Sequence, residues 1–113
     1  MRIALDLDGT LLCYNGWVDQ KHFEGPIKGA IEFVQELLKR GHDVKILTAR
    51  TNHELVKQKI VEYGFPPLPV TNIKQGIDLL IDDRAISFPG PHFYNDIENT
   101  VNNIEKWKPW WEK

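Results

Sequence analysis

The chain has little cysteine, no long hydrophobic run and no large excess of either charge. Its one cysteine, Cys13, excludes an intrachain disulfide and favours a reducing compartment. The first residues, MRIALDLDGT, reach charged side chains within six positions and so lack the apolar centre of a secretion signal. No later stretch is long enough to cross a bilayer. We therefore expect a cytoplasmic protein without a membrane partner.

The net charge and the length of the chain indicate which kinds of protein it can be. There are 14 Lys and Arg residues against 16 Asp and Glu residues, a formal net charge of −2. This argues against a protein held on nucleic acid by bulk charge, although it does not exclude a local basic groove. With 113 residues, of which 42% are hydrophobic, the sequence predicts one globular domain over residues 1–113.

Short apolar segments alternate with segments of helical periodicity. The predicted strands are all brief and apolar, at residues 3–7, 44–47, near 70, 77–81 and 85–88. The first helix is expected to open at Gly25-Pro26, since proline suits the first helical position, and to stop at Gly41.

Capping patterns place two more helices. Thr51 and Glu54 form a capping-box pattern for the second helix, which Gly64 ends. The third helix is expected to be capped by either Asn95 or Asp96 and ended by Pro109. Alternating strands and helices with all-apolar strands predict an α/β fold: a three-layer domain with a mostly parallel sheet and helices on both faces.

Ligands of such sheets bind outside the carboxyl ends of the strands. Those ends carry a set of polar residues: Asp6, Asp8, Thr48, Asp82 and Asp83. Converging carboxylates repel one another and are hard to keep ionised without a cation. Mg²⁺ prefers carboxylate oxygens and also accepts phosphate oxygens. The sequence therefore predicts a Mg²⁺ site among these acids.

Other residues near the same edge suit phosphate. Thr48 offers a hydroxyl, and the turn at Ala49 offers backbone donors near a helix start. Lys74 offers a positive charge to offset the oxygens of a phosphoryl transition state. Arg50 and Arg84 could bind a substrate phosphate, or each could pair with a nearby acid at the surface; the sequence leaves both open.

The motifs resemble those of the haloacid dehalogenase-like hydrolase superfamily. They are DLDGT at 6–10, ILTAR at 46–50, Lys74 and IDD at 81–83, in the family's order and at the spacing of its minimal domain. The resemblance covers the chain from Met1 to about Phe88. It implies a Rossmann-like sheet and a phosphohydrolase, with a phosphorylated molecule as substrate.

The resemblance also implies roles. Asp6 would attack phosphorus and form an aspartyl-phosphate, and Asp8 would serve as acid and then base. The Asp6 carboxylate, the Asp8 main-chain carbonyl and Asp82 would hold Mg²⁺, with Asp83 as a support or a ligand through water. Thr48 would bind phosphoryl oxygens, and Lys74 would neutralise the charge on Asp6 and the phosphate. The second acid, Asp8, indicates the phosphatase branch rather than dehalogenation.

The spacings leave no room for the cap domain of larger relatives, since residues 10–25 and 63–74 are too short to hold one. The substrate stays open: a small phosphometabolite, a nucleotide or a nucleic-acid end. Two other readings compete, a receiver-like phospho-acceptor signalling domain and an inactive phosphate-binding module. A receiver carries its acceptor acid on a middle strand, whereas the middle strand here ends in Thr48.

Three tryptophans, Trp107, Trp110 and Trp111, crowd the last seven residues. They could pin the tail onto the outer face of the sheet. Alternatively, they could form a homo-oligomer contact or a lid over the site of another subunit.

Overall fold

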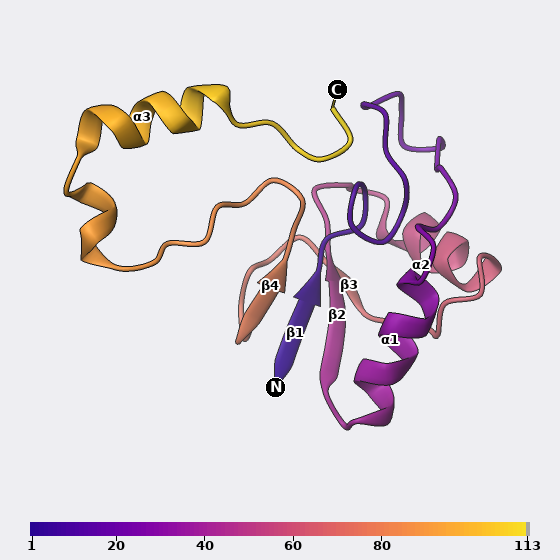
Figure 1. Cartoon of the computed structure of the whole chain (residues 1–113). Coiled ribbons are helices and arrows are strands. Elements are labelled where there is room, and N and C mark those ends of the chain that lie inside the picture. The colour runs from indigo at the N-terminus through magenta and orange to yellow at the C-terminus, as the bar shows by residue number, and fades with distance from the viewer. Residues whose placement is uncertain (113) are drawn as a thin grey trace.

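A computed structural model describes residues 1–112 of the chain (Figure 1). Its centre is a four-stranded sheet with the strand order β3-β2-β1-β4, and every pair is parallel. The strands are β1 (Arg2–Leu5), β2 (Asp43–Leu47), β3 (Val70–Thr71) and β4 (Leu79–Ile81). The predicted α/β class with a parallel sheet is confirmed.

The register of the sheet aligns the ends of its central strands. Leu5 of β1 pairs with Ile46 of β2 on one side and with Ile81 of β4 on the other. The next residue of β1, Asp6, donates its backbone N–H to the carbonyl of Ile81 at 2.9 Å. Asp82 follows Ile81 directly, so the register brings acids from two strands to one edge.

Two helices, α1 (Ala30–Lys39) and α2 (His53–Glu62), cover one face of this sheet. Residues that pair in register share a face, so Ile3 and Leu5 of β1 point the same way as Val44 and Ile46 of β2. These side chains form one buried cluster with residues of both helices, Ala30, Val34, Val56 and Ile60. Because Leu5 and Ile46 belong to this cluster, it holds the carboxyl ends of β1 and β2 in place.

The first helix begins later than predicted. Pro26 and Ile27 belong instead to a bridge with the loop after β1, where the Ile27 N–H donates to the carbonyl of Leu11 at 2.9 Å. Gly29, with a φ of 91°, then turns the chain into α1. The prediction of a start at Pro26 was therefore wrong because a tertiary contact uses that segment.

The cap of α2 also lies one residue later than predicted. The Asn52 side chain accepts the N–H of Leu55 at 3.2 Å and is the N-cap, in place of Thr51. Asp96 caps the last helix, α3 (Ile97–Lys106), by accepting the N–H of Asn99 at 3.1 Å, as predicted.

After β4 the chain leaves the sheet, and the prediction of a strand at 85–88 was wrong. Within residues 1–112, residues 85–90 form no strand pairing with any other segment. They lead to a short 3₁₀ turn, η1 (Pro91–Tyr94), and then to α3; we call residues 85–108 the arm. The only element that α3 contacts within residues 1–112 is η1. A helix layer on the second face of the sheet is therefore not confirmed.

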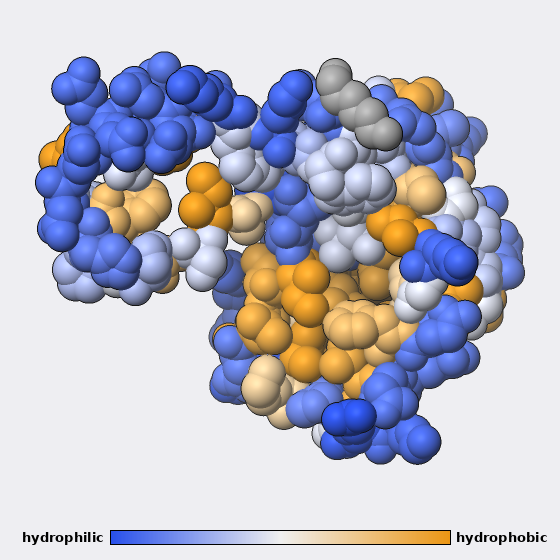
Figure 2. Space-filling model, in the orientation of Figure 1, coloured by the Kyte–Doolittle hydropathy of each residue, from blue (hydrophilic) through white to orange (hydrophobic). Residues whose placement is uncertain are grey.

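In the orientation shared by Figures 1 and 2, the arm extends to one side of the body and curves around an open space. The chain after α3 then returns to the body near the carboxyl edge of the sheet (Figure 1). Within residues 1–112, none of the helices has the length and apolar character needed to span a membrane.

Candidate active site

A cleft of about 550 Å³ lies at the carboxyl edge of the sheet. Every site residue predicted from the sequence lines it: Asp6, Asp8, Thr48, Ala49, Arg50, Lys74, Asp82, Asp83 and Arg84. They come from the ends of β1, β2 and β4 and from the β3–β4 connection. The fold therefore brings the whole predicted set to one place.

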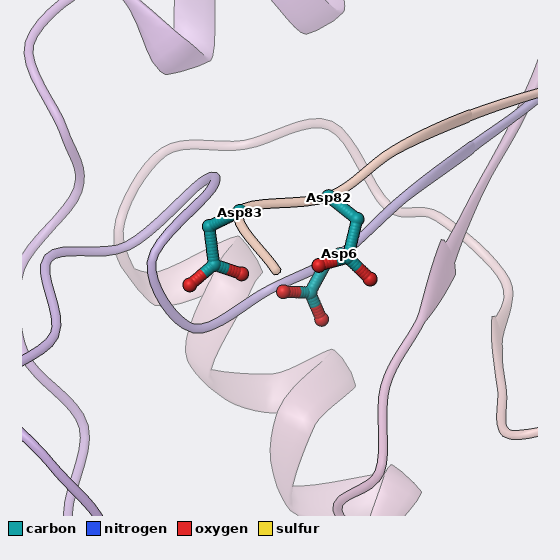
Figure 3. A group of neighbouring side chains, drawn as sticks. All are labelled: Asp6, Asp82 and Asp83. Carbon is teal, nitrogen blue, oxygen red and sulfur yellow. The ribbon is translucent and has the colours of Figure 1, made fainter. Parts of the chain in front are cut away.

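Three carboxylates form the floor of the site. Asp6, Asp82 and Asp83 each offer an oxygen within 4.8 Å of the others, and all three are partly buried. Figure 3 shows their side chains gathered between the ends of β1 and β4. The turn after β4 is shaped by the Arg84 N–H, which donates to Asp82 Oδ1 at 2.8 Å. This donor set fits a hard divalent cation such as Mg²⁺.

The pKa values of Asp6 and Asp83 also indicate a cation site. Burial, then a hydrogen bond with Asp83 and the charges of Asp82 and Asp83, raise the pKa of Asp6 to about 8. Burial pushes the pKa of Asp83 upward, but hydrogen bonds from Asp6 and from Trp111 outweigh it, so that this pKa is lowered. Without a cation, the raised pKa of Asp6 favours its protonated form at neutral pH. A divalent cation would offset the charges of Asp82 and Asp83 and so favour the ionised form.

The Asp8 carboxylate lies apart from this group and is held by Arg50. The guanidinium donates from Nε to Asp8 Oδ2 at 2.8 Å and from Nη2 to Asp8 Oδ1 at 3.0 Å. This two-pronged geometry fixes the orientation of a carboxylate. The metal role predicted for Asp8 concerned its main-chain carbonyl, and that role stays a prediction.

Arg50 was expected either to bind a substrate phosphate or to pair with an acid at the surface, and its observed position differs from both. It is 4% exposed, and its remaining donors reach the carbonyls of Gln20 at 3.2 Å and His22 at 2.8 Å. The rings of Phe23 and Trp17 lie 4.0 Å and 5.1 Å from its guanidinium carbon. Arg50 does pair with an acid, but in the interior rather than at the surface. A substrate role for Arg50 stays a prediction, and the observed contacts make it a support for Asp8.

Thr48 and Lys74 both line the cleft, as predicted, but Thr48 is buried and Lys74 is exposed. Thr48 is 4% exposed, and its Oγ1 accepts the Arg50 N–H at 3.1 Å, which shapes the turn at Ala49. Lys74 is exposed on the β3–β4 connection, and within residues 1–112 it forms no ion pair with Asp6. Its ammonium is therefore free to reach an anion in the cleft.

Five further residues line the cleft: Tyr14, Trp17, Gln20, Leu47 and Asn72. The sequence leaves two roles open for Tyr14 and Trp17, lining the entrance or packing their loop down, and it does not single out Gln20 or Asn72. Asn72 had a usable signal, because it directly follows β3 and strand ends meet at the same edge. Gln20 had none, since it lies in a loop without periodicity.

The C-terminal tail also reaches the site, which the sequence did not predict. Trp111 Nε1 donates to Asp83 Oδ2 at 2.6 Å, and Trp110 Nε1 donates to the carbonyl of Gly9 at 2.7 Å. Trp107 remains on the arm, 39% exposed. The tail thus contacts the site of its own chain.

Comparisons of the sequence with family models, with curated proteins and with solved structures gave no match. The residues of this chain and their geometry therefore carry what can be said of its function.

Proposed function

We propose that this protein is a Mg²⁺-dependent phosphomonoester hydrolase of the haloacid dehalogenase-like type, acting through a phosphoryl-aspartate on Asp6. One observation carries the proposal. Asp6 belongs to a group of carboxylates suited to a divalent cation and shares its cleft with Asp8, Thr48 and Lys74. A nucleophile, an acid/base group, a hydroxyl for phosphate and a cationic side chain therefore face the same space.

The reaction would proceed in two halves. An Asp6 oxygen attacks phosphorus as the bond to the leaving oxygen breaks. Asp8 enters this step in its protonated form, with one of its contacts to Arg50 released, and gives the leaving oxygen that proton. Asp8 then takes a proton from a water molecule that attacks the phosphoryl group, which releases phosphate and frees Asp6. Bound Mg²⁺ would supply positive charge that keeps Asp6 ionised and offsets the charge of the phosphate, with Asp6, Asp82 and Asp83 holding it.

The surrounding residues would orient these groups. Arg50 holds both oxygens of Asp8, so its carboxylate keeps one orientation at the cleft. Thr48 and the backbone at Ala49 would bind phosphoryl oxygens, and Lys74 would approach them from the open side. Arg84, also in the cleft, would contact the substrate.

We further propose that the site works without a cap domain, on a substrate that reaches an open cleft. The segments where relatives carry caps hold only loops and short elements here. An open cleft admits a small phosphometabolite, a nucleotide or the end of a nucleic acid. The cytoplasmic location, the second helix layer and an oligomer formed through the tryptophans stay predictions.

The test is phosphate release from an aryl phosphate and from a panel of nucleotides and sugar phosphates. We expect turnover with Mg²⁺, none with EDTA, and none for Asp6→Asn under any condition. The matched control is Asp78→Asn, which removes a carboxylate from an exposed ion pair with Arg2 and should leave turnover unchanged.

If no substrate turns over, labelling by a small phosphodonor separates the competing functions. A stable label on Asp6 would favour the receiver-like reading, because a hydrolase clears its phospho-aspartate. Absence of both turnover and label would favour a macromolecular substrate or a binding role. If phosphate is not released from nucleic-acid ends either, the proposal is contradicted.

A further inference from the structure

We propose that Trp111, two residues from the C-terminus, is a positioning residue that orients Asp83 for the divalent cation of the site. The inference rests on the proposed function, since it gives the carboxylates Asp6, Asp82 and Asp83 a cation to bind.

The first observation is the hydrogen bond itself. Trp111 Nε1 donates to one Asp83 oxygen, Oδ2, at 2.6 Å, across 28 residues of sequence. The other oxygen, Oδ1, lies 3.5 Å from Thr10 Oγ1, the hydroxyl that is equally close to Asp6 Oδ2. Since one oxygen is held by the indole, the carboxylate cannot rotate freely, and its second oxygen is left on the side of Asp6.

The second observation is the way the indole is held. The Tyr14 ring meets the Trp111 ring edge-on, with centroids 4.8 Å apart, and the Arg84 guanidinium carbon lies 4.9 Å from its centre. Trp110 ties the tail to the carbonyl of Gly9, and Pro109 beside it is buried. The indole is therefore fixed by residues that belong to the cleft or to its first turn.

The third observation is the close fit at Gly9. This glycine has a φ of +84°, which disfavours any side chain. A Cβ atom there would also overlap Asp83 Oδ2 and lie 2.9 Å from Trp111 Nε1. Three segments, around residues 9, 83 and 111, thus pack with no room for one more carbon atom.

A purely structural role explains these contacts less well. If the tail served to cover the core, α3 would be expected to pack on the sheet, yet within residues 1–112 it contacts only η1. The tail instead reaches Gly9, Tyr14, Asp83 and Arg84, all at the carboxyl edge. The arm acts as a tether between β4 and a tail that returns to the site.

The test compares the full-length protein with Trp111→Phe, which keeps an aromatic ring but removes the indole N–H. Isothermal titration calorimetry with Mg²⁺ should show an affinity about tenfold weaker for the variant, the order of effect of one charge-assisted hydrogen bond. Because Mg²⁺ assists the chemical step, kcat at limiting Mg²⁺ should fall more than KM rises. Trp107→Phe is the matched control, because it makes the same change on the arm away from Asp83, and it should bind Mg²⁺ like the wild type.

A wild-type measurement keeps the inference testable if Trp111→Phe does not fold. In ¹⁵N NMR spectra, Mg²⁺ should shift the indole N–H resonance of Trp111, whose acceptor is Asp83, and leave that of Trp107 in place. Equal Mg²⁺ affinities of folded Trp111→Phe and wild type, or an unmoved Trp111 resonance, would overturn the inference.

The outcomes separate this inference from the proposed function. A wild type that binds Mg²⁺ but hydrolyses nothing, with weaker binding in Trp111→Phe, would refute the hydrolase and support the positioning role. Turnover with equal Mg²⁺ affinity in wild type and variant would do the reverse. A wild type that binds no Mg²⁺ would refute both.

Discussion

Arg50 and Asp6 show how single residues are tuned at this site. Arg50 is a buried cation whose donors are used by one carboxylate and two backbone carbonyls, so little of its charge is left unpaired. Asp6 is the opposite case, an acid whose neighbours are other acids. The charge of Arg50 is balanced by its own contacts, whereas an ionised Asp6 would need a cation beside it.

Replacing Arg50 by lysine tests the support that it gives to Asp8. An ammonium cannot hold both oxygens of a carboxylate and both carbonyls at once, so Asp8 loses its fixed orientation. We expect kcat to fall about 10- to 100-fold and the free energy of unfolding to drop by about 1–3 kcal/mol. Steady-state kinetics and urea denaturation measure the two effects.

The control for this variant is Arg40→Lys, which alters an exposed pair with Glu36. It should change the free energy of unfolding by less than about 0.5 kcal/mol and leave kcat alone. An unchanged kcat in Arg50→Lys would show that Asp8 needs no support from the guanidinium.

The raised pKa of Asp6 predicts how the stability of the metal-free protein depends on pH. The folded protein keeps the Asp6 proton up to a pH of about 8, whereas the unfolded chain releases it at about pH 4. Between these values the folded state binds more protons, so its stability falls as the pH rises. The lowered pKa of Asp83 acts in the other direction, but only below about pH 4.

Thermal denaturation in EDTA between pH 5 and pH 8 measures this effect. The midpoint for the wild type should decline with pH relative to Asp6→Asn, which has no proton to lose. Mg²⁺ should flatten the wild-type curve. Parallel curves for wild type and variant in EDTA would contradict the raised pKa.

Among the secondary-structure elements, α2 is placed by its cap and by its buried face. Val56 and Ile60, four residues apart, both lie in the core, and Asn52 fixes the first turn just after the phosphate-binding candidate Thr48. α1 is placed by a bridge between Pro26 and Leu12 as much as by its own periodicity. Elements near the site therefore take their limits from contacts that join distant segments.

The cap of α2 can be tested with two neighbouring variants. Asn52→Ala removes the acceptor for the Leu55 N–H and should lower the free energy of unfolding by about 1 kcal/mol. Thr51→Ala, one residue earlier, should change it by less than half of that amount. A larger loss for Thr51→Ala in urea denaturation would restore the capping box predicted from the sequence.

Across the whole molecule, the body and the arm differ in how they are held. The body has a buried cluster shared by β1, β2, α1 and α2. On the arm, the rings of Phe88 and Tyr94 contact that of Phe93, one tilted and one edge-on. Ile97, Val101 and Ile104 of α3 are each at least 44% exposed. The body also leaves a patch of apolar side chains uncovered on the face seen in Figure 2. Leu79 of β4 is 43% exposed. The arm is therefore attached through its two ends, at β4 and at the tail.

The sequence was sufficient for much of this protein because its strongest signals are local. Apolar segments bounded by glycine and proline marked the strands of the sheet, and acids directly after β1 and β4 marked its functional edge. Asp96 as the cap of α3 could also be read, since it lies one residue before the helix that it caps. The acids and Thr48 in the cleft followed from one rule, that parallel strands end at the same edge. Gln20, in a loop without periodicity, did not.

Tertiary structure alone decided the features that join residues far apart in the chain. The pairing of Arg50 with Asp8 spans 42 residues, and the bond from Trp110 to Gly9 spans 101. The late start of α1 and the absence of a strand at 85–88 likewise depend on which segments meet. Periodicity and capping report the free energy of neighbouring residues, whereas these contacts depend on distances that exist only once the chain has folded.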